Sequence, residues 1–160
     1  MKFSFGKSIK YKSFKIASDV KNISLNNYAL KLNGNLAITN VFEGMYTIKN
    51  TKNSNIYYNI GDLGKPKTTL EEVVEDVSGK YKNIAGLKVT NEDVLRWGVN
   101  IKVIKVEVTG QALEQWGTAY FENYFFVHKN SLLEISITTE KKVSNFTELA
   151  DEFLNCVTLK

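Results

Sequence analysis

Hydrophobic residues recur at every second position in the first part of the chain, which is the pattern of β-strands. Residues 28–32 and 36–38 alternate in this way on either side of Asn33-Gly34. Two residues that tolerate positive φ between alternating runs predict a β-hairpin. Similar runs predict further strands over residues 3–9, 14–17, 45–49 and 56–60, and a polar turn over 49–55 joins the last two in a hairpin. We therefore expect antiparallel sheet in the segment before residue 61.

The hydrophobic spacing changes to three and four after residue 69. Five apolar residues follow this spacing: Leu70, Val73, Val74, Val77 and Tyr81. The spacing predicts an amphipathic helix over 70–82, and Thr69 and Glu72 have the positions of a capping box. Acidic residues fill the first turns, where the backbone N–H groups carry positive partial charge. Helix geometry alone therefore explains the acidic cluster.

Alternation returns in the last third of the chain. It predicts strands over residues 94–97, 99–108, 118–128 and 132–139, with a tight turn at 129–131. Val103 and Ile104 break the alternation, and two adjacent apolar residues predict a β-bulge or a twisted edge. A second amphipathic helix is expected over 145–156, behind a Ser144 cap.

These elements predict an α+β fold, with an antiparallel sheet covered by two amphipathic helices in an α/β/α sandwich. A chain of 160 residues without a linker or repeat predicts a single domain, 1–160. A domain of this size buries about 70% of its unfolded surface. The composition is 43% hydrophobic and 24% charged, which excludes a disordered chain.

The inventory of catalytic side chains is small, because the chain has one histidine and one cysteine. Sites that need two such residues are impossible within one copy, and His128 with Cys156 is the one available nucleophile and imidazole pair. We predict neither enzyme activity nor a cofactor or metal. The sequence context singles out no Asp or Glu as a catalytic acid or base. We expect Glu107 and Glu134 to face solvent or to pair with lysines across the sheet.

Two other patterns are better explained by structure than by function. The segment 61–68 looks like a phosphate loop, but two residues separate its glycines where four are needed, and Pro66 occupies the Ser/Thr position. We predict a turn there. The aromatic residues could form a stacking platform for single-stranded nucleic acid, but core packing explains them better. They are Trp97, Trp116, Tyr120, Phe121, Tyr124, Phe125 and Phe126.

The net charge of +4 is unevenly distributed along the chain. Residues 1–69 hold eleven lysines and three acidic residues, whereas residues 70–160 hold ten basic and fourteen acidic residues. A positive N-terminal face would attract an anionic partner. The alternative is that these lysines keep the strand edges soluble and prevent them from pairing.

The basic strip at the N-terminus supplies the candidate contact residues. We expect Lys10, Tyr11, Lys12 and Phe14 to touch an acidic partner protein, with the lysines speeding encounter and the aromatic rings slowing release. Tyr11 and Phe14 fit core positions of a strand equally well. Because Cys156 is alone and no apolar run reaches membrane-spanning length, we expect a cytoplasmic protein without a signal peptide or membrane insertion.

The order of elements from residue 68 onward resembles the PsbP/DcrB-like superfamily. The resemblance rests on the helix entry 69–74, the strand 99–108, the aromatic strand 120–127, its hairpin to 132–138 and the closing helix 146–156. The superfamily has an α/β/α sandwich and includes photosystem accessory proteins, bacterial lipoproteins, secretion-effector chaperones and a Ran-binding import factor. The resemblance implies a scaffold generally used for binding proteins, without a shared catalytic site. We expect a bacterial protein.

The favoured function is therefore a non-catalytic protein-binding module, such as an immunity or inhibitor protein or an effector chaperone. The alternative is a binder of an anionic ligand or nucleic acid through the basic N-terminal region. A carboxylate-based hydrolase is the least favoured.

Nucleic-acid binding makes a prediction that salt can test. Each neutralised phosphate releases counterions, so phosphate-driven affinity falls steeply as salt rises. We expect only weak, nonspecific binding of DNA or RNA at ~150 mM salt, measured by fluorescence anisotropy. A micromolar or tighter complex that is lost on substituting Lys7, Lys10, Lys12 and Lys15 would favour the alternative function.

Overall fold

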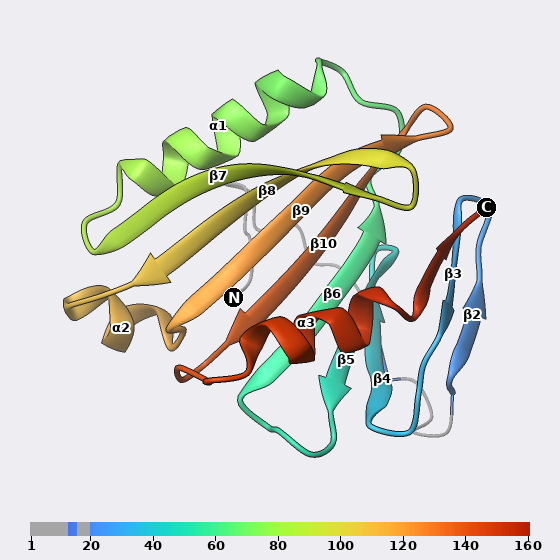
Figure 1. The fold of residues 1–160 in the computed structure, drawn as a ribbon, viewed down its shortest axis with the longest axis horizontal. Coiled ribbons are helices and arrows are strands. Elements are labelled where there is room, and N and C mark those ends of the chain that lie inside the picture. The colour runs from blue at the N-terminus through green and yellow to red at the C-terminus, as the bar shows by residue number, and fades with distance from the viewer. Residues whose placement is uncertain (1–12, 16–19) are drawn as a thin grey trace.

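The computed structural model describes residues 13–15 and 20–160, and within them the chain forms a mixed α+β fold of two antiparallel sheets and three helices (Figure 1). The larger sheet contains, in spatial order, β1 (Ser13–Lys15), β4 (Leu36–Phe42), β5 (Met45–Asn50), β6 (Ile56–Asp62), β10 (Ser131–Thr139), β9 (Tyr120–His128), β8 (Val99–Val108) and β7 (Leu87–Arg96). The smaller sheet contains β11 (Val157–Leu159), β3 (Tyr28–Lys31) and β2 (Asn22–Ser24). The helices are α1 (Leu70–Lys82), α2 (Gln111–Trp116) and α3 (Phe146–Leu154).

The hairpins show where local pattern determines pairing and where it does not. β5 pairs with β6, and β9 pairs with β10 through a turn in which Lys129 and Asn130 have φ of 49° and 61°. Both hairpins are as predicted. The hairpin expected around Asn33 is wrong, because β3 pairs with β2 and β11 while β4 pairs with β1 and β5. The turn forms, but tertiary packing sends its two strands into different sheets.

The bulge or twisted edge predicted in β8 is also wrong, because β8 lies between β7 and β9 in the sheet. Register with β7 and with β9 continues unbroken through Val103 and Ile104. Both residues are buried, and they belong to two separate cores. Two adjacent apolar residues in a regular strand therefore report that both faces of the sheet are covered here.

The first core lies between one face of the larger sheet, α3 and the smaller sheet. Phe153 of α3 stacks on Tyr58 of β6 with ring centroids 4.8 Å apart, and the Tyr58 hydroxyl donates to the Leu149 carbonyl at 3.0 Å. Leu30 of β3 and Val157 of β11 join the same cluster. The prediction that a helix covers this face of the larger sheet is thus confirmed only in part, because the smaller sheet covers the same face together with α3.

The second core lies between α1 and the opposite face. Val74, Val77 and Tyr81 pack with Ile104 of β8 and Phe121 of β9. The helix begins and ends as predicted, and the Thr69 hydroxyl accepts a hydrogen bond from the Glu72 backbone N–H at 3.2 Å. The second predicted helix is shorter than expected, because α3 ends at Leu154 and the chain returns to strand as β11. The predicted Ser144 cap is wrong: Asn145 is the N-cap residue, and its side chain makes no capping hydrogen bond. None of the helices in the described ranges is long and apolar enough to cross a membrane.

The first core makes a direct stability prediction. Phe153→Ala should lower the free energy of unfolding by about 3 to 5 kcal/mol, because it removes a fully buried ring that Tyr58 and its neighbours cannot replace. Thr147→Ala, at an exposed position of the same helix, should change it by less than about 0.5 kcal/mol. Urea unfolding measures both; equal effects of the two substitutions would contradict the assignment of the α3 face.

Candidate functional site

The predicted contact residues lie mostly outside the described residues. Lys10, Tyr11 and Lys12 fall outside the described residues, so their contact role stays a prediction. The backbone of Phe14 belongs to β1, where it pairs opposite Val41 of β4. This pairing places Phe14 at the end of the larger sheet that is farthest from α1 and β7.

The one imidazole and the one thiol are each engaged elsewhere. A ring nitrogen of His128 lies 2.6 Å from the carbonyl oxygen of Lys160, and the Cys156 thiol donates to the Glu152 carbonyl at 3.2 Å. Burial raises the pKa of the Cys156 thiol, which disfavours the thiolate that a nucleophile needs. Within the described ranges, no cluster of three His, Cys, Asp or Glu side chains could hold a metal ion.

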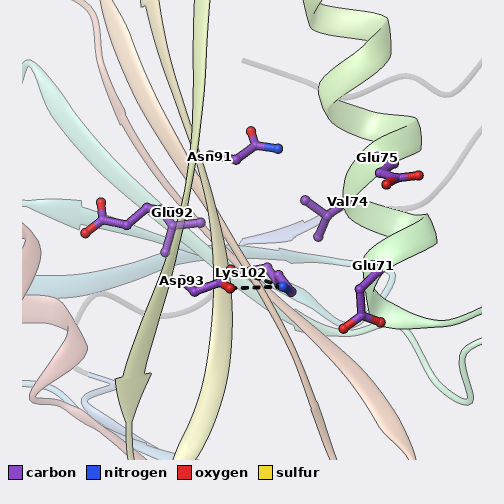
Figure 2. Close-up of a pocket in the computed structure, with 8 residues that line it drawn as sticks. Glu71, Val74, Glu75, Asn91, Glu92, Asp93 and Lys102 are labelled. Carbon is purple, nitrogen blue, oxygen red and sulfur yellow. Dashed lines mark hydrogen bonds and ion pairs between the residues drawn. The ribbon is translucent and has the colours of Figure 1, made fainter.

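A groove of about 170 Å³ opens between α1 and the strands β7 and β8 (Figure 2). Its lining comes from three elements: Glu71, Val74 and Glu75 of α1, Asn91, Glu92 and Asp93 of β7, and Lys102 and Val103 of β8. In Figure 2 the two glutamates of α1 lie across from Asn91, whereas Glu92 points to the other side of β7. The groove thus carries carboxylates on both walls.

The charges of the groove do not cancel. Lys102 forms an ion pair with Asp93 at 3.1 Å, while Glu92 pairs with Lys105 on the opposite face of the sheet. No ion pair reaches Glu71 or Glu75 from the residues that the structure describes, and both side chains are exposed. The groove is therefore negative in sum and suited to a cationic group.

Helix and strand geometry place these residues together. Glu71 and Glu75 are one helical turn apart and so share a face of α1. Asn91 and Asp93 are two apart in β7 and so share a face of the strand. The sequence showed each spacing, but the helix dipole already explained the acids and nothing indicated that α1 packs along β7. The groove could not be found without the tertiary arrangement.

Within the part of the chain that the structure describes, no strand pairs with the outer edge of β7. Among the described residues β7 pairs with β8 alone, and its ten residues hold register without a bulge or proline. Leu95 lies two residues beyond Asp93, on the same face of the strand, and is 73% exposed. The edge presents backbone donors and acceptors, beside an acidic groove and an uncovered apolar side chain.

Glu134 corrects one expectation about the carboxylates. It was expected to face solvent or pair with a lysine, but it is 8% exposed between Gly61 and Phe125 on the neighbouring strands. Burial raises the pKa of its carboxyl group to about 7. Tyr81 donates to nearby Asn123 at 3.0 Å, and no hydrogen bond or ion pair joins Glu134 to another described residue. Tyr81 of α1 lies close enough to interact electrostatically with Glu134. The sequence predicted a helix over the sheet, but not which strands that helix covers.

Comparison with known proteins identifies the fold. No protein-family model matches the chain, and no curated protein matches its sequence. Among solved structures, the cyanobacterial PsbP protein CyanoP from Synechocystis sp. PCC 6803 is 8% identical, with a TM-score of 0.50 over 86% of this chain and 95% of that chain. LpqN, involved in cell envelope biogenesis of Mycobacterium tuberculosis, is 8% identical, with a TM-score of 0.57 over 94% of this chain and 91% of that chain.

These likenesses confirm the predicted resemblance at the level of the fold, which is PsbP-like. The match also extends well beyond the segment 68–160 on which the resemblance rested, because it covers most of the chain.

The buried carboxyl of Glu134 makes stability depend on pH. Its pKa of about 7 in the folded state exceeds the usual value of 4.5, so the folded protein holds the proton more tightly than the unfolded chain does. Its stabilising contribution is full below about pH 4.5 and is lost as pH rises to about 7. Glu134→Gln should therefore gain stability over the wild type across this range, by up to about 3 kcal/mol. Urea unfolding at several pH values measures this.

The matched control is Glu140→Gln, which changes an exposed carboxylate just after the same strand. It should keep the pH dependence of the wild type. The difference in unfolding free energy between the wild type and Glu134→Gln should change between pH 5 and pH 8. A constant difference would contradict a folded-state pKa of about 7 for Glu134.

Proposed function

We propose that this protein is a non-catalytic protein-binding module that receives an extended, basic segment of a partner protein along the outer edge of β7. The observation that carries the proposal is the open ten-residue edge beside the acidic groove of α1. The PsbP-like fold supports a binding role only as a scaffold, because fold alone does not define function.

An extended segment added to β7 would gain backbone hydrogen bonds along a regular edge. Its side chains would alternate between the two faces of the enlarged sheet. Those on the helix side would lie beside Asn91 and Asp93, within reach of Glu71 and Glu75. The next side chain on that face would cover Leu95. In this arrangement the backbone hydrogen bonds supply affinity, and the charges of the groove supply selectivity.

The chemistry of the groove selects the partner. Unpaired carboxylates on α1 favour lysine or arginine at alternate positions of the incoming segment and repel nucleic-acid phosphates. At about 170 Å³ the groove is smaller than the roughly 300–1,000 Å³ typical of sites for whole small molecules. It suits side chains delivered by a larger partner.

Charged side chains on β7 itself oppose the pairing of this strand with β7 of a second copy. Lys88, Glu92 and Asp93 stand on the edge strand, and charges at an edge are a common protection against self-association. The two acids are held by Lys105 and Lys102 of β8. The edge therefore remains available to a basic partner while aggregation is discouraged.

An immunity or inhibitor protein, or an effector chaperone, would use such an edge to hold a partner chain in an extended form. In either role the protein works by binding, and we propose no catalytic step. The acidic partner expected for Lys10, Tyr11, Lys12 and Phe14 would contact a different part of the chain and remains a separate prediction.

Charge reversal in the groove tests the proposal. A protein captured from the native host should bind the double variant Glu71→Lys/Glu75→Lys at least about tenfold more weakly than the wild type, because each reversal repels a basic segment. The control is Glu72→Lys/Asp76→Lys, which makes the same charge change on the same helix outside the groove and should bind like the wild type.

Hydrogen exchange gives the second measurement. Binding should protect the backbone amides of 87–96 from exchange, because strand addition pairs the open edge. Protection that appears only at another surface, or equal loss of binding in both double variants, would show that β7 is not the binding edge. Turnover of any substrate by the purified chain, abolished by one carboxylate substitution, would refute the non-catalytic role.

A further inference from the structure

The two outer strands of the larger sheet differ in charge. β1 and β7 stand at opposite ends of this sheet, and within the described ranges β1 pairs with β4 alone and β7 with β8 alone. The segment 7–15, which ends in β1, has no acidic residue and holds Lys7, Lys10, Lys12 and Lys15. The edge of β7 lies beside the acidic groove. The two ends of one sheet are therefore complementary in charge, and each presents a strand edge that invites pairing.

The face of β7 beside α1 sets an order of side chains for an incoming strand. The groove residues Asn91 and Asp93, opposite Glu71 and Glu75 of α1, are followed on this face by Leu95, which is 73% exposed. Side chains on one face of a strand are two residues apart. A strand that runs parallel to β7 therefore matches this face with basic, basic and apolar residues at alternate positions.

The chain itself contains this order at residues 10–14. The segment reads Lys-Tyr-Lys-Ser-Phe, so two lysines and a phenylalanine fall on one face of an extended strand. The same order recurs at residues 80–84, but both lysines of that run belong to α1 and are helical. The N-terminal run therefore fits the β7 edge in charge, spacing and order.

One copy does not reach its own groove with this segment. The seven spacings between the eight strands of the larger sheet, at about 4.8 Å each, separate β1 from β7 by about 34 Å along the sheet. In Figure 1, β7 and β4, the neighbour of β1, lie on opposite sides of the molecule. Lys10 is three residues before Ser13, where β1 begins, and three residues span at most about 11 Å. The groove within reach of Lys10 and Lys12 therefore belongs to another copy.

We propose that the partner of the β7 edge is a second copy of this chain. Its segment 10–14 runs parallel to β7, with Lys10 and Lys12 beside the carboxylates of the groove and Phe14 over Leu95. This inference rests on the proposed function and names the occupant of the edge. It also names the acidic partner expected for the N-terminal strip. Because the contact joins two different surfaces, association can continue beyond a dimer.

Sedimentation velocity of the full chain over a range of concentrations tests the contact. We expect the wild type to self-associate, and its affinity should fall as salt rises because opposite charges meet. Lys10→Glu/Lys12→Glu and Glu71→Lys/Glu75→Lys should each associate at least about tenfold more weakly, because each places like charges at the contact.

A mixture of these two double variants gives the sharpest result. The acidic strip of Lys10→Glu/Lys12→Glu complements the basic groove of Glu71→Lys/Glu75→Lys. The mixture should therefore regain the association that each variant alone has lost, which requires direct contact between the two surfaces. Recovery also shows that both variants are folded.

The matched control is Lys49→Glu/Lys52→Glu, which makes the same charge change at two exposed lysines of β5 and the turn after it. It should associate like the wild type, because β5 lies inside the sheet between β4 and β6. Equal losses in this control and in Lys10→Glu/Lys12→Glu would show that net charge, and not the strip, governs association.

Three results would overturn the second copy as the partner: a wild type that stays monomeric up to ~100 µM, association that Lys10→Glu/Lys12→Glu leaves unchanged, or a mixture that does not associate. The edge itself is judged separately, by capture of a protein from the native host. A monomeric chain whose capture of a host protein depends on Glu71 and Glu75 would support the proposed function with another partner. If neither capture nor self-association depends on these glutamates, both proposals fail.

Discussion

Burial of both faces of the central strands is the constraint on which the rest of the structure depends. β8 and β9 place Val103 and Tyr124 in one core and Ile104 and Phe125 in the other. Apolar area removed from water on both sides stabilises these strands, at about 25 cal/mol per Å². The helices and the smaller sheet can dock only because each strand of this centre offers apolar side chains in both directions.

The same constraint explains the buried polar groups. A strand covered on both sides has no solvent face, so each carboxylate within it must find partners or hold its proton. Glu122 accepts hydrogen bonds from two tyrosine hydroxyl groups, and Lys105 lies near enough to interact with its charge. Glu134 has no such partners among the described residues, and its pKa rises instead. Of these two glutamates in neighbouring strands, Glu122 is thus stabilised by hydrogen bonds, whereas the pKa of Glu134 is raised.

Open surface remains where the two-sided cover ends. On the α1 face it ends at the outer edge of β7, where Glu71 and Glu75 leave a negative groove. On the other face it ends beside Phe146, where the segment before α3 leaves an apolar hollow with Lys142 at its rim. The two surfaces differ in shape and in charge. A scaffold with a rigid centre can therefore leave two different surfaces open at its margins.

The sequence by itself determined the local elements: α1 with its Thr69 cap, the β5–β6 and β9–β10 hairpins, and the mixed α+β class. These depend on residues close in the chain, whose spacing fixes which side chains share a face. Only the tertiary structure decided that β3 leaves β4 for a second sheet, that Val103 and Ile104 mark two cores, and that Glu134 is buried. It alone also placed Glu71 and Asp93 in one groove and Tyr120 beside Phe146. The physical reason is that strand pairing and burial are set by contacts between residues far apart in the sequence, and hydrophobic attraction has no direction that a local pattern could encode.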